Sequence, residues 1–397
     1  MKVLQVNTVC GTGSTGRIAT DIYKILEKQG YESSIAYGRG SAPKDINSIK
    51  IGTDFNNYMH VAKTRLFDKH GFSSIKTTKE FIKKAKEYNP DVIHLHNIHG
   101  YFLNIELLFN YLKEVNKPVV WTLHDCWTFT GHCAYFDYVE CDKWKLACNN
   151  CPQKNSYPKS LFVDNSKNNY KRKKELFTGI KNMTIVTPSK WLGELAKQSF
   201  LKEYSVSVIH NGVDLDKFKH TDSDFRAKNG LEGKFLILGV ANIWDRRKGL
   251  NDFIELSRRL SSDYKIIIVG ISKEQKKNLP DNIIAITRTN NIEELVEIYS
   301  AADVFVNTTY EDNFPTTNLE ALACGTPVIT YDTGGSVESI IDENCIIPKG
   351  NVDILVNTIL EKKFKTAKFY DPNVIDINKE KCFEKYLELY KEVGENK

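Results

Sequence analysis

The chain has 397 residues, 41% hydrophobic and 26% charged, so it is long enough for two or three globular domains with substantial cores. This composition excludes a disordered chain and a fibrous protein. Lysine and arginine total 55 against 50 acidic residues, an excess too small to indicate nucleic-acid binding. No apolar run reaches the ~18 residues of a membrane-spanning helix, and the first residues predict a strand rather than a signal peptide. We therefore expect a cytoplasmic protein.

Apolar strands alternate with amphipathic helices along the whole chain, which predicts doubly wound α/β domains. The first half has a predicted helix over about 17–29 and predicted strands at 3–9, 34–37, 92–96, 119–123 and 184–187. The pattern restarts with a helix over 248–260 and strands at 235–240, 265–269, 283–287, 303–307 and 327–330. We predict domains over 1–205 and 206–375, with a closing segment over 376–397. Ligands of open α/β sheets bind outside the carboxyl ends of the strands, so we expect a ligand cleft between the domains.

Residues 11–16 have the G-x-G-x-x-G spacing of dinucleotide-binding loops and lie between a predicted strand and a predicted helix. The acidic residue that should follow the second strand is missing, and Arg39 stands near that position. An arginine suits a 2′-phosphate, so an NADP-dependent enzyme is one hypothesis. We favour a substrate loop, in which Gly13, Ser14 and Gly16 contact the acceptor and the helix start at 16–17 faces an anionic group.

Residues 310–327 carry the most specific motif of the second half. A predicted strand leads into Glu311 and Asp312, and Pro315 is expected at the favoured first position of a helix. Backbone N–H groups at this helix start can hold a pyrophosphate, and we expect them on Thr316, Thr317 and Asn318. Glu320, one turn further along the helix, is placed to accept both hydroxyls of a ribose.

This motif resembles the retaining GT-B nucleotide-sugar glycosyltransferases of the large family 4, most closely those that make capsule and exopolysaccharide of the colanic-acid type. The resemblance also rests on the segments 209–214, 247–250 and 122–125, and it spans nearly the whole chain. It implies a GT-B fold, in which two Rossmann-like domains face each other across a cleft. It also implies that the chain transfers a sugar from a nucleoside diphosphate sugar to a lipid-linked or oligosaccharide acceptor, with retention of configuration and without a catalytic metal.

The resemblance also assigns roles to residues. Glu320 matches the residue that holds the donor ribose, and either Asp312 or the adjacent Glu311 contacts the donor sugar. Lys248 contacts the diphosphate. The donor-binding arginine of the family is replaced here by Asn242, and Arg246 or Arg247 can substitute for it. In the first half the resemblance places His124 against the donor sugar, and we expect His96 on the acceptor side. The closing helix, over about 379–393, is expected to pack back on the first domain.

Two alternatives stay open. A GT-B epimerase acting on nucleotide sugars would use the same donor site. A catalytically silent GT-B subunit that binds glycan is favoured by Asn242 and by the aspartate at position 312. The basic run 171–174 is interpreted as a solvated helix face, with docking on the inner face of an anionic membrane as the alternative.

The insert over 126–152 is rich in cysteine and aromatic residues. Its spacing C-x7-C-x6-C-x2-C, formed by Cys133, Cys141, Cys148 and Cys151, provides enough thiols for a structural zinc site. A small satellite core with free thiols is the other interpretation, and the sequence does not choose between them. The aromatic residues predict a loop beside the acceptor, where rings can stack on sugars.

Overall fold

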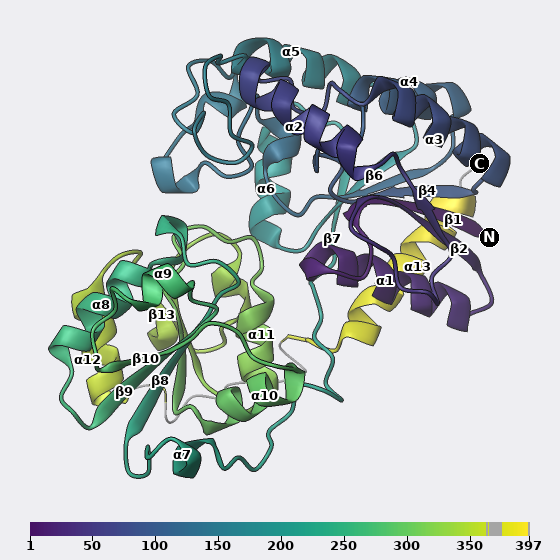
Figure 1. Cartoon of the computed structure of the whole chain (residues 1–397). Helices are drawn as coiled ribbons and strands as arrows, with labels where there is room; N and C mark the ends of the chain where they lie inside the picture. Colours follow the sequence, from purple (N-terminus) through teal and green to yellow (C-terminus); the bar gives the residue numbers. More distant parts are fainter. Residues whose placement is uncertain (363, 365–374, 396–397) are drawn as a thin grey trace. The chain divides into compact units, whose positions relative to one another are not determined.

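The computed structural model describes residues 1–362, 364 and 375–395, which form two compact units (Figure 1). The first unit contains Met1–His210 and the chain from Phe383 onward, and the second contains Asn211–Cys382. Each unit is a parallel sheet between helices, so the predicted pair of doubly wound α/β domains is confirmed. Residues 363 and 365–374 of the predicted second domain and 396–397 of the closing segment lie outside the described residues.

The first sheet has the strand order β3-β2-β1-β4-β5-β6-β7 among the described residues. The strands are β1 (Lys2–Val9), β2 (Glu32–Arg39), β3 (Ser48–Lys50), β4 (Val92–Leu95), β5 (Val119–Thr122), β6 (Met183–Thr187) and β7 (Ser205–Val208). β1 pairs in parallel with both β2 and β4, so the strand order reverses there. The carboxyl ends of β1 and β4 form the switch point where such sheets bind ligands.

The helices of the first unit cover both faces of its sheet. They are α1 (Gly13–Lys28), α2 (Asp54–Phe67), α3 (Ile75–Tyr88), α4 (Ile105–Val115), α5 (Ser166–Phe177), α6 (Lys190–Gln198) and most of α13 (Lys379–Glu395). Figure 1 shows α3, α4 and α5 over one face, with α1 and α13 on the other. The core under α4 and α5 is aromatic. The ring centroids of Phe109, Trp121 and Phe177 lie 4.4–5.2 Å from one another.

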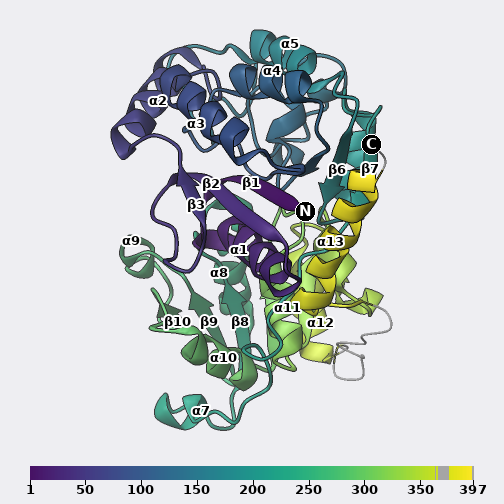
Figure 2. The same cartoon turned by 90° about the vertical axis from the view of Figure 1, so that its right-hand side faces the viewer.

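The second sheet has the order β10-β9-β8-β11-β12-β13, with its reversal at β8. Its strands are β8 (Phe235–Val240), β9 (Tyr264–Val269), β10 (Ile283–Ile286), β11 (Val304–Asn307), β12 (Val328–Tyr331) and β13 (Ile346–Ile347). The helices are α7 (Phe225–Lys228), α8 (Leu250–Arg259), α9 (Lys273–Lys276), α10 (Ile292–Ala301), α11 (Thr316–Ala323) and α12 (Val352–Glu361). Figure 2 shows β10, β9 and β8 in succession. One apolar core lies under α10 and α11, and another lies under α8 and α12.

Helix α13 belongs to the first unit from Phe383 onward. Tyr390 on this helix contacts His94 of β4, with 2.6 Å between the hydroxyl and Nδ1. The Tyr386 hydroxyl lies 3.1 Å from that of Thr122 in β5. These buried polar contacts tie the last described helix to the two central strands of the first sheet.

The helix starts at α1 and α8 differ from the sequence-based prediction by two residues or more. Helix α1 begins at Gly13, four residues earlier than predicted, because the turn is completed within 11–13, where Gly11 and Gly13 adopt φ of 73° and 64°. Helix α8 begins at Leu250, and Lys248 lies in the preceding 3-10 turn η4 (Arg246–Lys248). Gly249 between them has φ of 70°, a left-handed conformation that separates the two elements.

The basic run on α5 is a solvated face at Lys171 and Lys174, which are exposed, but Lys173 departs from that interpretation. Lys173 is buried, and its ammonium donates to the carbonyls of Trp127 and Thr130 at 2.7 and 3.0 Å. Arg172 pairs with Glu106 at 2.6 Å. These contacts engage Arg172 and Lys173 within the first unit, whereas Lys171 and Lys174 face solvent. None of the described helices has the length and apolar character needed to cross a membrane.

Buried histidines should make the first unit sensitive to acid. Burial lowers the pKa of His60 to about 3 and that of His124 to about 4, and it holds the pKa of His70, His94 and His96 well below the ordinary value. As the pH falls below ~6.5, the unfolded chain takes up protons that the folded unit does not. Each such proton lowers the free energy of unfolding by up to ~1.4 kcal/mol per pH unit. Against the ~5–15 kcal/mol of a typical domain, we expect unfolding near pH 5.

Tryptophan fluorescence measures this transition, because the tryptophans at 121, 127, 144 and 191 lie in the first unit and only Trp244 lies in the second. The substitution His220→Gln, at a histidine of the second unit, is the control and should leave the midpoint unchanged. Native fluorescence down to pH 4 would contradict the prediction.

Candidate active site

The carboxyl edge of the second sheet brings two loops together. One follows β8 and ends in η4, and the other joins β11 to α11. Gly249 allows their close approach, since a Cβ there would lie 2.2 Å from the Thr308 carbonyl oxygen. The Thr308 hydroxyl donates to the carbonyls of Lys248 and Gly249 at 3.0 and 3.1 Å. The Tyr310 N–H donates to the Arg247 carbonyl at 2.7 Å. The two loops therefore form one hydrogen-bonded surface.

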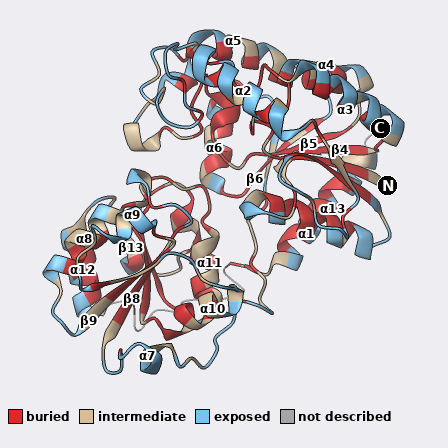
Figure 3. Ribbon diagram, viewed as in Figure 1, coloured by how far each residue is buried: buried red, intermediate tan, exposed pale blue. Residues whose placement is uncertain are grey.

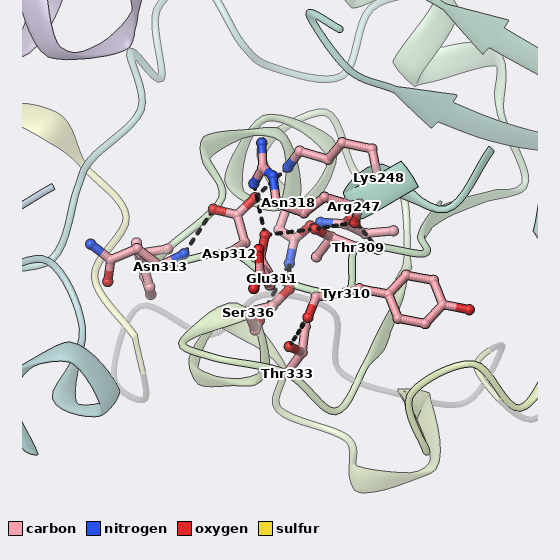
Figure 4. Close-up of polar contacts among 12 residues, drawn as sticks. Arg247, Lys248, Thr309, Tyr310, Glu311, Asp312, Asn313, Asn318, Thr333 and Ser336 are labelled. Carbon is pink, nitrogen blue, oxygen red and sulfur yellow. Dashed lines mark hydrogen bonds and ion pairs between the residues drawn. The ribbon is translucent and has the colours of Figure 1, made fainter. Parts of the chain in front are cut away.

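Lys248 and Asp312 meet on this surface (Figure 4). The Lys248 ammonium forms an ion pair with the Asp312 carboxylate, and the two side chains are 20% and 16% exposed. Beside them the Arg247 guanidinium donates to the Glu311 carbonyl at 2.9 Å. A partly exposed lysine held by one carboxylate is available to a polyphosphate, because both charges remain accessible to solvent and ligand.

The two acidic residues of the motif, Glu311 and Asp312, differ in burial. Glu311 is 2% exposed, whereas Asp312 is partly open and carries the ion pair. The position of Asp312 is fixed through its backbone: its carbonyl accepts from Gly335, and a Cβ at Gly334 would lie 1.9 Å from that oxygen. Asn242, at the position where the family has an arginine, is exposed in the loop after β8.

Helix α11 starts one residue later than predicted, so Pro315 is its N-cap and Thr316 is the first helical residue. Thr316 and Thr317 are half-buried, and N–H groups of a first turn have no acceptor within the helix. Asn318 does not offer the free N–H predicted from the sequence, because it donates to the Pro315 carbonyl at 3.2 Å. Its side chain is also fully buried, in contact with Asn307, Ser336 and Ser339.

Glu320 lies on the next turn of α11. Its Oε2 accepts a hydrogen bond from the Tyr299 hydroxyl at 3.0 Å, and its side chain is half-buried. Burial and the Glu320 carboxylate raise the pKa of Tyr299 well above its ordinary value, so the phenol remains a donor to Glu320. This contact fixes one carboxylate oxygen and orients the other.

In the first unit, His124 follows β5 directly. Its Nε2 lies 3.2 Å from Nδ1 of His96, and Nε2 of His96 lies 3.0 Å from Oε1 of Gln5. The His96 and His124 rings are stacked, with centroids 5.5 Å apart. Burial lowers the pKa of His124 to about 4 despite the adjacent Asp125, so its imidazole is neutral at pH 7. His124 is partly exposed, whereas His96 is 1% exposed with both ring nitrogens engaged. The geometry therefore does not favour the acceptor contact expected of His96.

The glycine loop also differs from its predicted role. Gly13 and Ser14 are exposed at the start of α1. Gly16, expected at the helix start, is buried in the first turns, and a Cβ there would lie 3.0 Å from the Val9 side chain. Gly16 therefore allows the helix to pack on β1, and only Gly13 and Ser14 remain accessible.

The cysteines of the insert gather around one small cavity. Cys133, Cys141, Cys148 and Cys151 all line it, and a hydrogen bond from Cys133 lowers the pKa of Cys151. The Gly131 N–H donates to the Cys148 sulfur at 3.2 Å. Even so, no three His, Cys, Asp or Glu side chains in the described ranges are arranged to hold a metal ion. The zinc alternative therefore has no support in this structure.

Sequence reasoning missed the residues that hold the candidate side chains in place. Gln5, which contacts His96, looked like an ordinary polar residue in the first strand. Tyr299 lies on a different helix from its partner Glu320, and no motif connects the two. Of these supporting residues, only Gly249 could have been found from the sequence, because it directly follows Lys248 of the recognised motif.

The two Rossmann-like units have the architecture of a GT-B fold. Two family profiles match the chain: Glycosyltransferase Family 4 over residues 15–217 and Glycosyl transferases group 1 over residues 221–363. The first of these covers about half of the chain. The chain belongs to Glycosyltransferase Family 4.

Similar proteins agree with this assignment. The putative colanic acid biosynthesis glycosyl transferase WcaC of Escherichia coli is 27% identical over 352 residues, 85% of each chain. A Campylobacter jejuni protein, N,N'-diacetylbacillosaminyl-diphospho-undecaprenol alpha-1,3-N-acetylgalactosaminyltransferase, is 26% identical over 51% of this chain and 58% of its own. Sucrose-phosphate synthase of Thermosynechococcus elongatus shares the fold, with a TM-score of 0.69, 17% identity and full coverage of both chains. Anabaena Alr3699/HepE, solved with UDP, has a TM-score of 0.67 at 15% identity and covers 99% of this chain and 100% of its own.

Proposed function

We propose that this chain is a retaining glycosyltransferase of surface polysaccharide biosynthesis, which transfers a sugar from a nucleoside diphosphate sugar to a lipid-linked or oligosaccharide acceptor. The second unit binds the donor, and the first unit binds the acceptor. The observation that carries the proposal is the partly exposed Lys248–Asp312 ion pair in front of α11. The colanic acid and diphospho-undecaprenol named for two relatives support this acceptor class.

The donor contacts follow from charge. In the reaction the bond between the sugar C1 and the diphosphate oxygen breaks, and the leaving nucleoside diphosphate keeps the electron pair. Lys248 and the first N–H groups of α11, on Thr316 and Thr317, stabilise the charge that develops there. Arg247 holds the acidic loop through the Glu311 carbonyl. The acceptor hydroxyl forms the new bond on the face that the diphosphate leaves, and its proton passes to a diphosphate oxygen. In this proposal Lys248 and the N–H groups take the place of a metal ion in stabilising the leaving group.

Asp312, rather than the buried Glu311, contacts the donor sugar in this proposal, because its carboxylate is accessible. In the first unit, neutral His124 forms a hydrogen bond with the sugar, and we assign His96 a positioning role instead of the acceptor contact. Gln5 is hydrogen-bonded to His96, and His96 is hydrogen-bonded to His124, so we propose that these two contacts hold the His124 ring in position. Gly13 and Ser14 remain the proposed acceptor contacts.

A catalytically silent, glycan-binding subunit is the second candidate, and the exposed Asn242 favours it. The missing arginine removes one diphosphate contact of the family, and Arg247 is occupied by the Glu311 carbonyl. Lys248 is evidence against this candidate, because the lysine of the family motif is present and its side chain is 20% exposed.

The substitution Glu320→Ala tests the ribose contact. We expect nucleotide affinity to fall at least tenfold, since the ribose hydroxyls lose their acceptor in a half-buried site. Isothermal titration calorimetry with the free nucleoside diphosphate measures the change. Glu297→Ala, which removes a glutamate of α10 in the same unit, is the control and should bind normally. Unchanged affinity in Glu320→Ala would remove this residue from the donor site.

A thermal-shift screen against UDP-, GDP- and ADP-sugars identifies the donor. A ligand that binds the native state raises its stability by RT ln(1 + [L]/Kd), about 2.7 kcal/mol at a hundredfold excess over Kd. We expect one nucleotide series to raise the melting temperature. No shift with any series, at concentrations that saturate family members, would contradict donor binding.

A further inference from the structure

Helix α2 has its polarity reversed. Its buried side carries Asn57, His60 and Thr64, whereas its large apolar side chains face solvent. Phe55 is 70% exposed and Tyr58 is 72% exposed, and Met59, Leu66 and Phe67 are 43–52% exposed. Figure 3 shows this helix largely in the colour of exposed residues. A surface helix normally buries its apolar stripe, so this arrangement requires a reason other than packing of the unit.

A second apolar segment adjoins the end of this helix. Leu161, Phe162 and Val163 are all exposed, Phe162 by 72%. The Leu161 N–H donates to the Arg65 carbonyl at 2.7 Å, which places this segment beside the last turn of α2. We call the exposed apolar residues of the two segments the apolar face. They are Phe55, Tyr58, Met59, Leu66, Phe67, Leu161, Phe162 and Val163.

The apolar face holds more than half of the exposed large hydrophobic side chains in the described residues. Single exposed hydrophobic residues need no explanation, but a contiguous set marks a surface that binds something apolar. Three aromatic rings on one short helix are typical of side chains that enter the boundary between lipid headgroups and acyl chains.

The charges around the apolar face are mostly basic. Lys63, Arg65 and Lys69 are exposed on or directly after α2, and the Lys69 ammonium lies 5.9 Å from the Phe67 ring centroid. Three acidic residues lie along the apolar face. Asp164, directly after Val163, is exposed and accepts from the N–H groups of Cys151 and Ser166 at 2.6 and 2.9 Å. Asp68 is buried against His132 at 2.7 Å, and Asp54 at the far end of the helix pairs with Lys50 at 3.8 Å. This combination of apolar and basic side chains complements an anionic lipid surface.

We propose that the apolar face docks the protein on an anionic lipid bilayer, with the aromatic rings in the headgroup boundary and the basic residues against lipid phosphates. A second copy of the chain fits less well, because a two-fold interface would place the same three cations of each copy near one another. Docking would bring the enzyme to a membrane-embedded acceptor. That consequence rests on the proposed function, but the docking itself does not.

Vesicle flotation tests the proposal with the full chain. We expect the protein to float with vesicles rich in phosphatidylglycerol and to bind pure phosphatidylcholine at least tenfold more weakly, with binding reduced by added salt. The double substitution Phe55→Ser/Tyr58→Ser should lower binding to the anionic vesicles at least tenfold. Lys63→Gln/Lys69→Gln should lower it on anionic vesicles and leave the weak phosphatidylcholine binding unchanged.

The matched control is Ile354→Ser/Leu360→Ser, which removes two exposed apolar residues from α12 in the second unit and should bind as the wild type does. Circular dichroism and the donor-induced thermal shift verify that each variant is folded and retains its donor site. Vesicle binding is therefore judged separately from sugar transfer. Failure of the wild type to float, or equal flotation of Phe55→Ser/Tyr58→Ser, overturns the proposal. A dimer in sedimentation velocity that this variant abolishes also overturns it and assigns the face to self-association.

Discussion

Lys248→Ala should lower kcat for sugar transfer by about 10²–10³-fold while the affinity for the nucleoside diphosphate falls less than tenfold. The reason is that negative charge develops on the diphosphate during the reaction. The diphosphate gains negative charge as the glycosidic bond breaks, so the contact with the ammonium strengthens from ground state to transition state. The ion pair with Asp312 holds Lys248 at the site before the donor arrives. Steady-state kinetics combined with calorimetry separates the two effects.

Lys234→Ala is the matched control for this substitution. Lys234 also pairs with an aspartate, Asp263 at 3.4 Å, but it precedes β8 and so lies at the opposite edge of the same sheet. We expect its kinetics to be unchanged. Equal losses of kcat and nucleotide affinity in Lys248→Ala would indicate that the lysine only binds the ground state.

His124→Ala should keep nucleoside diphosphate binding within about twofold, while transfer falls by about two to three orders of magnitude, or ~3–4 kcal/mol of transition-state stabilisation. His124 lies in the first unit, and the proposed nucleotide contacts lie in the second. Under the proposed function it contacts the sugar end of the donor, and only in the reacting complex. Transfer assays and calorimetry on the same preparation measure both quantities.

Two further variants define the role of this histidine. His96→Gln should lower transfer less than His124→Ala does, because glutamine can keep one of the two hydrogen bonds that fix the ring. His220→Ala, in the second unit, is the control. Nearly intact transfer in His124→Ala would mean that His124 has no role in the reaction. Loss of nucleotide binding would contradict the assignment of the nucleotide contacts to the second unit.

The fold was largely predictable because the parallel strands are buried on both faces and appear as continuous apolar runs. Strands with little apolar content were missed. β3 and β7 read Ser-Ile-Lys and Ser-Val-Ser-Val, and they lie at the two edges of the sheet. Helix starts shifted by up to four residues where glycines set the turn, as at Gly13 and Gly249. At Gly249 the left-handed turn brings the backbone against the Thr308 carbonyl, a contact between distant residues that sequence spacing does not reveal.

The candidate site was predictable in its charged residues but not in their supports. Lys248 and Asp312 belong to recognisable motifs, and the structure brings them into contact. The engagement of His96 by Gln5 depends on two neighbouring strands that are 91 residues apart in sequence. Lys173 is buried although its neighbours Lys171 and Lys174 are exposed as the lysine-rich run suggested, because tertiary packing decides which cations of a run face solvent.

The most direct test of the central claim is the release of nucleoside diphosphate when the purified protein is incubated with UDP-, GDP- and ADP-sugars. The Lys248→Ala variant serves as the blank. We predict that one of these donors is cleaved by the wild-type protein and that the rate falls at least a hundredfold in the variant. If the wild type releases no more nucleoside diphosphate than Lys248→Ala from any donor, with and without lipid extract as acceptor, the chain is not an active transferase. The silent-subunit alternative would then replace the function proposed for it.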